Sequence, residues 1–163
     1  MILKNPEKFM GYLFEVAWIL PSVAIPVAVI TAVVITAFAV GLRVPDVAGR
    51  IEPKAIAVTE PFDEPGLREL APGKYQAAMI AQVFLFTPNE IEVPAGSEVT
   101  FVLTSRDVIH GFKIVGTPVN MMVVPGQISK LTVRFDRPGE YLLVCHEYCG
   151  SGHHVMSGKV IVR

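Results

Sequence analysis

Apolar residues are most concentrated near the start of the chain, where residues 16–42 form a run of 27 without one charged side chain. As an α-helix this run would be roughly 40 Å long, more than the ~30 Å hydrocarbon core of a bilayer. Trp18 near its start and Arg43 at its end are typical of a membrane surface. The pattern predicts a membrane anchor over residues 1–42, with a transmembrane helix at about 13–42.

Two other interpretations of this run stay open. The core helix of a soluble protein would have to be buried on every side to hide such uniform apolarity. The triplet Ala37-Phe38-Ala39 resembles the cleavage site of a signal peptide, although the apolar run is about twice the usual 7–15 residues. Basic residues flank the run on both sides, so charge does not indicate an orientation.

Residues 43–74 have a different character. They carry mixed charges and little apolar periodicity, with prolines at Pro45, Pro53, Pro61, Pro65 and Pro72. Proline-rich segments of this kind are semi-rigid and extended. The pattern predicts a tether that holds a folded domain away from the membrane.

From residue 75 to residue 163 the period of the apolar positions becomes two. Val99, Phe101 and Leu103 alternate with polar residues, and the run 130–135 alternates even more clearly. Turn residues separate such runs, as at Pro138-Gly139. Six to eight short strands in this length predict a mainly β fold, a small antiparallel sandwich.

The composition narrows the class of function. Lysine and arginine number 14 and aspartate and glutamate 15, for a formal charge of −1, which argues against nucleic acid as a partner. After residue 74 acidic and basic side chains are equal in number, so the β domain has no excess charge to steer a charged partner. Two cysteines are too few for a disulfide-stapled scaffold.

Both cysteines and three of the four histidines lie within residues 145–156, together with Met156. The fourth histidine, His110, follows an apolar stretch upstream. Thiolate, thioether and imidazole ligands together suit copper. A single blue copper needs one cysteine, two histidines and a weak axial methionine, and here a second cysteine is present. The pattern predicts that Cys145 and Cys149 bridge two copper ions that share an electron.

The placement of the cluster supports this interpretation. The strand predicted at residues 140–144 delivers Cys145 into a loop, and residues 159–163 supply a closing strand. Gly150 and Gly152 give the loop the backbone freedom to surround a compact metal site.

Three other kinds of site remain open at this point. A disulfide between Cys145 and Cys149 would leave the histidines and Met156 unexplained. A zinc site of two cysteines and two histidines would leave Met156 unused and would not carry electrons. A mononuclear copper site would leave one cysteine without a role.

The same segment resembles subunit II of cytochrome c oxidase, over the motif Cys145-x-Glu147-x-Cys149-x-x-x-His153-x-x-Met156 with upstream Val108-Ile109-His110. The resemblance covers the anchor and residues 75–163. It implies a cupredoxin domain with two copper ions in a dinuclear CuA centre. The ligands it implies are the side chains of His110, Cys145, Cys149, His153 and Met156 and the backbone carbonyl of Glu147.

Two departures from the larger family are visible. The chain has one predicted membrane helix instead of two, which resembles the B-type haem–copper oxidases and implies a single-pass protein with its copper domain outside the cell. The aromatic-rich segment through which electrons enter is absent, and the run 82–87 stands in its place. Phe84 or Phe86 is the candidate for that role, although two phenylalanines on a strand also suit core packing.

The family implies a function in electron transfer only. The chain would accept electrons from a cytochrome c or small copper protein and pass them to haem in a large oxidase subunit, where oxygen is reduced. A CuA subunit of a nitric oxide reductase and a free-standing membrane-anchored copper carrier are the alternatives. A rigid, closed metal site suits a copper chaperone poorly, because a chaperone must release its metal.

Further side chains near the motif have candidate roles. His146 and His154 fall between motif positions and are predicted not to be ligands. Asp107 and Glu147 are candidates for holding the ligands in place. The resemblance also implies that the Glu147 side chain could help to bind a non-redox metal at the interface with the large subunit. Residues expected to pack around the copper site and exclude water are Phe112, Met121, Met122 and Val124.

Overall fold

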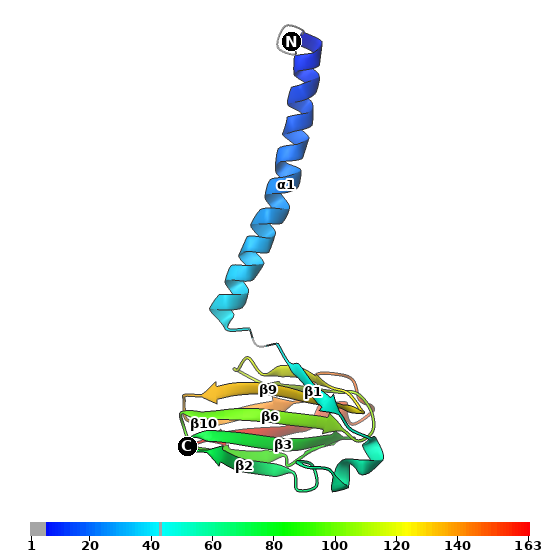
Figure 1. Ribbon diagram of the computed structural model, residues 1–163, viewed down its shortest axis with the longest axis vertical. Helices are drawn as coiled ribbons and strands as arrows, with labels where there is room; N and C mark the ends of the chain where they lie inside the picture. The colour runs from blue at the N-terminus through cyan, green and yellow to red at the C-terminus, as the bar shows by residue number, and fades with distance from the viewer. Residues whose placement is uncertain (1–5, 43) are drawn as a thin grey trace. The chain divides into compact units, whose positions relative to one another are not determined.

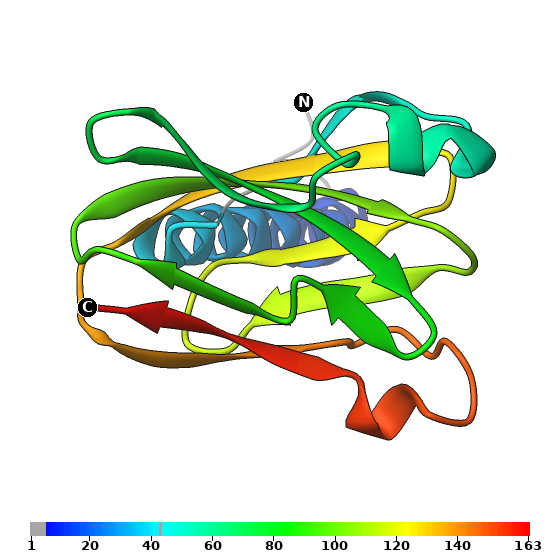
Figure 2. The ribbon, with the colours of Figure 1, turned by 90° about the horizontal axis from the view of Figure 1, so that it is seen from below.

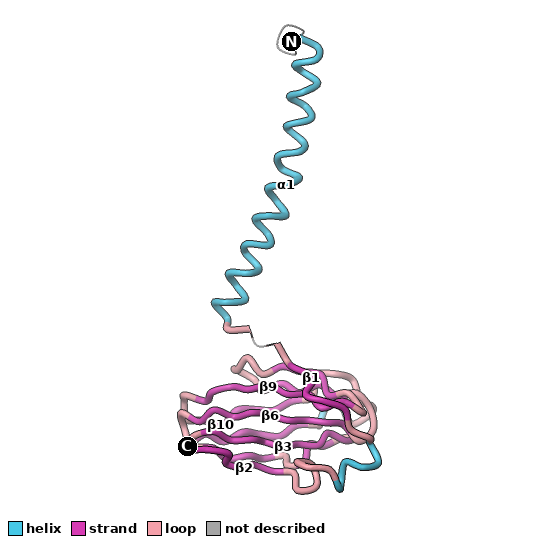
Figure 3. The backbone as a smooth tube through the Cα atoms, in the orientation of Figure 1, coloured by secondary structure: helices cyan, strands magenta, loops and turns pink. Residues whose placement is uncertain are grey.

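The structure is a computed structural model that describes residues 6–42 and 44–163. The chain divides into two compact units, Met1–Leu42 and Arg43–Arg163. The first contains one long helix, and the second consists almost entirely of strands and loops (Figure 3).

The first unit is the helix α1 (Pro6–Val40), which contains an 18-residue stretch of mean hydropathy 2.6. By length and composition it is able to cross a membrane. It begins earlier than the predicted residue 13, because proline suits the first turn of a helix. It ends before Gly41, whose φ of 67° is the left-handed conformation that terminates helices. Arg43 and residues 1–5, which the sequence assigned to the anchor or its flank, lie outside the described residues.

Three hydroxyl groups within α1 form hydrogen bonds inside the helix. The hydroxyls of Ser22, Thr31 and Thr36 donate to carbonyl oxygens four residues earlier, at 2.6–2.8 Å. No described residue of α1 is buried against protein, unlike the core helix of a soluble protein. The absence of buried residues in the described helix α1 therefore supports its interpretation as a candidate membrane helix.

The second unit packs two sheets face to face, and the first has six strands. Their order is β1-β9-β6-β3-β2, visible from top to bottom in Figure 1, with β4 also paired to β3. These strands are β1 (Asp46–Arg50), β2 (Gly66–Ala71), β3 (Lys74–Gln82), β4 (Leu85–Thr87), β6 (Ser97–Ser105) and β9 (Gln127–Phe135).

The second sheet has five strands in the order β5-β11-β10-β7-β8. These strands are β5 (Glu90–Val93), β7 (His110–Ile114), β8 (Asn120–Val123), β10 (Gly139–Val144) and β11 (Ser157–Val162).

The core lies between the sheets and follows the alternation seen in the sequence. In β6 and β9 the residues predicted to face inward are buried: Val99, Phe101, Leu103, Leu131, Val133 and Phe135. Aromatic rings join the sheets, because Phe112 from the second sheet lies 5.4 Å from Phe101 and 5.6 Å from Phe86. The predicted mainly β sandwich with one N-terminal apolar helix is confirmed.

Two of the strand pairings are parallel, β3 with β6 and β5 with β11, whereas the sequence predicted an antiparallel sandwich. Parallel neighbours need a crossover connection. Here the chain leaves the first sheet after β4, forms β5 in the second sheet, and returns as β6. This crossover is a property of the topology that periodicity within one strand does not reveal.

The sequence predicted an extended tether over residues 43–74, but in the structure most of this segment is folded into the β domain. This segment contributes β1, which pairs with β9, and β2, which pairs with β3. Between them runs a short 3-10 helix, η2 (Pro53–Val58). A second apolar cluster forms on the outer face of the first sheet, from Ile51, Ile56, Phe62, Ile80 and Val102. The segment is thus part of the sandwich, and its prolines interrupt local regularity without preventing long-range pairing.

Candidate metal centre

The two cysteines come together just beyond the end of β10. Cys145 follows Val144, the last residue of the strand, and Cys149 lies in the loop that leads to β11. Their sulfur atoms are 3.9 Å apart, and both thiols are free and buried. A disulfide needs a sulfur–sulfur distance near ~2.05 Å, so the structure does not contain the disulfide considered as an alternative.

His110 approaches the cysteines from the neighbouring strand. It is the first residue of β7, which pairs with β10, and its side chain is 0% exposed. Its Nδ1 atom lies 4.0 Å from Cys145 Sγ. The ligand atoms of His110, Cys145 and Cys149 all lie within 4.8 Å of one another, as expected of side chains that hold one metal site.

His153 and Met156 lie on the other side of the cysteine pair. The Cys149 sulfur is 3.6 Å from His153 Nδ1 and 3.7 Å from Met156 Sδ. A 3-10 turn, η3 (His153–Val155), joins the two residues, and the backbone N–H of Cys145 donates to the Met156 carbonyl at 3.2 Å. That hydrogen bond closes the loop, which Figure 2 shows in orange at the end of the domain opposite the C-terminus.

Three further residues of the loop, His146, Glu147 and His154, have exposed side chains. The backbone carbonyl oxygen of Glu147 lies 3.3 Å from Cys145 Sγ, while its side chain is exposed. His146 and His154 are also exposed, and neither appears among the close contacts of the cysteine sulfurs. The His146 ring instead covers Gly111, where an added Cβ would meet Cγ of that ring at 2.6 Å.

The chemistry of this donor set fits copper. Two thiol sulfurs, two imidazole nitrogens and a thioether are the soft and borderline ligands that copper prefers, and a backbone carbonyl oxygen can serve as a weak axial ligand. Burial, and then the neighbouring Cys145, raises the pKa of Cys149 to about 11. Two buried thiolates this close need nearby positive charge, because without it burial and mutual repulsion keep the thiols protonated.

Asp107 supports His110 from behind. Its Oδ1 atom accepts a hydrogen bond from His110 Nε2 at 2.8 Å and its Oδ2 atom accepts one from the Val83 backbone N–H at 2.7 Å. Burial alone would raise the pKa of Asp107, but hydrogen bonds from His110, Val83 and Val108 outweigh it and lower that pKa below its usual value. The candidate role in holding a ligand thus has a geometric basis, and the bond to Val83 was not foreseen.

The two phenylalanines proposed for electron entry lie in different environments. Phe86 is 1% exposed and packs edge-to-face on Phe112, so it belongs to the core. Phe84 is half-buried and its ring rests on the loop backbone at Gly150 and Gly152. Of the pair, Phe84 is the one beside the candidate metal centre.

Of the four residues expected to pack around the site, two are buried and two are not. Phe112 and Met121 are buried in the core cluster that also contains both cysteines and Met156. Val124 is half-buried, and Met122 is 40% exposed because it points to the outer face of β8. The apolar surroundings of the thiols therefore come from the inward-facing residues of that set.

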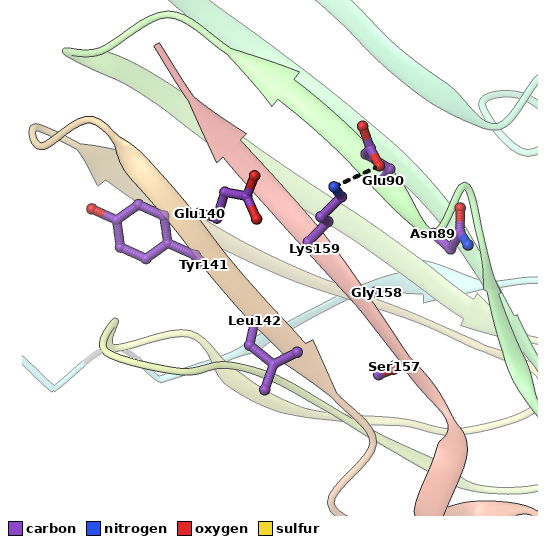
Figure 4. Close-up of a pocket in the computed structure, with 8 residues that line it drawn as sticks. All are labelled: Asn89, Glu90, Glu140, Tyr141, Leu142, Ser157, Gly158 and Lys159. Atoms are coloured by element: carbon purple, nitrogen blue, oxygen red, sulfur yellow. Dashed lines mark ion pairs between the residues drawn. The ribbon is translucent and has the colours of Figure 1, made fainter.

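A surface hollow on the outer face of the second sheet is separate from this centre. Its lining residues come from β10, β11 and the start of β5, and Figure 4 shows Lys159 and Glu90 pointing toward each other across it, 3.2 Å apart. None of the predicted ligands lines the hollow.

Comparisons with known proteins identify relatives of this chain. The family described as "Cytochrome C oxidase subunit II, periplasmic domain" matches residues 69–162. Cytochrome c oxidase subunit 2 of Thermus thermophilus is 40% identical over 116 residues, which cover 70% of this chain and 86% of the relative. Haem–copper oxidase subunit 2 of Aeropyrum pernix is 40% identical over 78 residues, 47% of this chain and 33% of the relative.

Solved structures extend the likeness to the fold. A chain from the cryo-EM structure of a haem–copper terminal oxidase dimer aligns with a TM-score of 0.73 and 32% identity, covering 91% of this chain and 99% of its own length. The periplasmic domain of subunit II of cytochrome oxidase from Bradyrhizobium japonicum has a TM-score of 0.51 at 19% identity, covering 54% and 83%, and supports the fold alone. Matching family, sequence relatives and fold together place this chain in the cytochrome c oxidase subunit II family, whose members are subunits of an oxidoreductase complex.

Proposed function

We propose that the sulfurs of Cys145 and Cys149 would hold the two copper ions of a dinuclear CuA centre, and that this chain receives the electrons that a haem–copper oxidase uses. When bound, the copper pair would supply a one-electron carrier. The remaining ligands would be His110, His153, Met156 and the backbone carbonyl of Glu147.

One observation carries this proposal: each thiol has its own set of partners. Cys145 lies near His110 Nδ1 and the Glu147 carbonyl, and Cys149 lies near His153 Nδ1 and Met156 Sδ. The two sets meet at sulfurs 3.9 Å apart. A mononuclear copper site would leave one of the two cysteines without a role, and a zinc site of two cysteines and two histidines would leave Met156 without one.

The chain's own residues would keep this geometry constant during electron transfer. Asp107 orients the His110 ring, and the hydrogen bond between Cys145 and Met156 ties the two ends of the loop. Buried apolar residues, among them Phe112 and Leu143, exclude water from the thiols. A site that moves little between oxidation states needs little reorganisation for each transfer.

Electron paramagnetic resonance of the copper-loaded chain tests the centre. The proposal expects hyperfine structure from one electron shared equally by two copper nuclei, with two copper ions bound per chain. The spectrum of an isolated copper ion, or one metal per chain, would contradict it. Cys145→Ser and Cys149→Ser should each abolish the shared-electron spectrum, whereas His146→Ala and His154→Ala should keep it.

The electron donor, a cytochrome c or small copper protein, would dock on the loop end of the domain. Large apolar side chains are exposed on the loop and beside it, including Val83, Val108, Ile109, Tyr148 and Val155. The Tyr148 ring also contacts the His153 imidazole, with centroids 5.9 Å apart. A largely apolar surface suits a domain whose charges balance, because steering by a net field is weak.

Docking is separable from the metal centre by experiment. Val155→Asp should slow the second-order reaction with reduced cytochrome c by about tenfold, since it places a charge in an apolar contact. Its copper spectrum should be unchanged. Val58→Asp, which alters a valine that is 81% exposed on η2, is the matched control. Equal rates for both variants would locate docking elsewhere.

The partner would be the large haem-bearing subunit of the oxidase, in the same membrane as α1, with the copper domain on the outer side. Purification from a membrane in mild detergent tests this directly. A haem-containing protein with oxygen-reducing activity should accompany the tagged chain. A partner that reduces nitric oxide would favour a CuA subunit of a nitric oxide reductase. The absence of any haem protein would favour a free-standing membrane-anchored copper carrier.

A further inference from the structure

The turn between β3 and β4 lies against the candidate metal loop. Figure 2 shows this turn, in green, at the same end of the domain as the orange loop. The ring of Phe84 makes the contact. A Cβ at Gly150 would lie 2.9 Å from Phe84 Cε1, and a Cβ at Gly152 would lie 2.6 Å from Phe84 Cγ. Such distances leave no room for a side chain, so the ring sits directly on the backbone between Cys149 and His153.

The same turn is fastened on its other side to the His110 ligand. The backbone N–H of Val83 donates to Asp107 Oδ2 at 2.7 Å, and Asp107 Oδ1 accepts from His110 Nε2 at 2.8 Å. Val83 and Phe84 are consecutive in the chain. One short turn therefore connects the support of His110 to the loop that carries Cys149 and His153.

The glycines show that this contact is specific. Gly150 has a φ of 131°, which few other residues adopt, so its identity has a backbone reason. Gly152 has a φ of −92°, which any residue adopts. What excludes a side chain at Gly152 is therefore the Phe84 ring, whose aromatic carbons are closer to it than any other group.

We propose that Val83–Phe84 acts as a clasp over the metal loop, with Phe84 as the residue that positions the 149–153 segment. This inference rests on the proposed metal centre for its purpose. The ring keeps Cys149 buried and the loop closed, and the Asp107 bond keeps the ring in place. Phe84 acts through the loop backbone and is a positioning residue, not a ligand.

The clasp makes predictions for the metal-free chain, which keep its test separate from that of the copper centre. Phe84→Ala should open the loop and raise the rate at which a maleimide alkylates Cys149 by about tenfold, since local opening governs access to a buried thiol. Gly152→Ala should do the same by pushing the ring outward. In the double variant Phe84→Ala/Gly152→Ala the added methyl meets no ring, so its rate should not exceed that of Phe84→Ala alone.

Matched controls exist in the same domain. Leu85→Ala removes the next side chain of the turn, which is 41% exposed. Gly66→Ala adds a methyl where a Cβ would meet nothing within 4 Å. In both control variants, a maleimide should alkylate Cys149 at the wild-type rate. Circular dichroism of every variant verifies that the sandwich is folded.

Copper-loaded protein provides the second measurement. Release of copper to a chelator should be about tenfold faster in Phe84→Ala and Gly152→Ala than in the controls. Wild-type rates in both assays, or additive effects in the double variant, would overturn the clasp. If the wild-type chain bound no copper pair, the proposed function would fail, while the alkylation rates would still decide whether the clasp exists.

Discussion

The carboxylate of Asp107 and the imidazole of His110 meet at 2.8 Å, between Oδ1 and Nε2, on the side of the ring opposite Cys145. This bond leaves Nδ1 as the nitrogen that faces the cysteine sulfur. A buried histidine with one nitrogen occupied in this way has a defined tautomer and orientation before any metal arrives.

Asp107→Asn tests the consequence for metal binding. The variant keeps the shape of the side chain but loses the charge and one acceptor, so His110 and Val83 compete for a single oxygen. Copper affinity, measured by competition with a chelator, should fall by about 10- to 100-fold. Asp136→Asn is the control, because Asp136 is exposed and its ion pair is with Arg134, two positions away in sequence. Equal losses in the two variants would remove the special role of Asp107.

Met156→Leu tests the thioether. Leucine preserves the buried apolar volume and removes the sulfur that lies 3.7 Å from Cys149 Sγ. The domain should fold with nearly wild-type stability, while the reduction potential of the copper centre should shift, because a weak axial ligand tunes that potential. Met121→Leu is a close control, since Met121 is also 2% exposed and is not among the described close contacts of either thiol. A potential that moves equally in both variants would show that general packing, not the thioether, sets it.

The metal-free chain should show a stability change that belongs to Cys149. Burial and the neighbouring Cys145 raise its pKa to about 11, against about 8.5 for a thiol in an unfolded chain. Between those values the folded chain keeps a proton that the unfolded chain has lost. Stability should therefore be constant below about pH 8.5, with respect to this group, and fall as pH rises toward about 11.

Urea unfolding of the metal-free chain at several pH values measures this effect. Cys149→Ala lacks the thiol and should lose less stability over the alkaline range than the wild type. Parallel curves for the two proteins would show that Cys149 does not titrate as its surroundings suggest.

Phe62→Ala tests the part of the domain that the sequence assigned to a tether. Phe62 is 1% exposed and fills the apolar cluster on the outer face of the first sheet. Its truncation should lower the free energy of unfolding by about 3–5 kcal/mol, as for other buried phenylalanines. Val58→Ala in the same segment should change it by less than about 0.5 kcal/mol, because Val58 is exposed. Thermal unfolding followed by circular dichroism compares them, and a Phe62 variant as stable as the Val58 variant would restore the tether interpretation.

The sequence predicted those features that depend on local patterns of residues. An uncharged apolar run predicts a helix because every backbone group must be satisfied within it, whatever lies around. Alternation in β6 and β9 predicts inward-facing Phe101 and Leu131, since successive side chains of a strand point to opposite faces. The candidate metal ligands could also be picked out from the sequence, because soft ligands at short spacing such as Cys145 and Cys149 have few other uses.

Contacts between distant segments were decided by the tertiary structure. Residues 43–74 lack a strong local period, yet β1 and β2 join the sheet because pairing partners in β9 and β3 lie far away in sequence. Asp107 binds Val83 across 24 positions, and the absence of a side chain at Gly152 follows from a ring on another turn. The sequence thus determined the long apolar helix, the strand faces and the set of candidate ligands. Only the fold decided how the first strands join the sandwich and what holds the metal loop closed, because those energies depend on which segments meet in space.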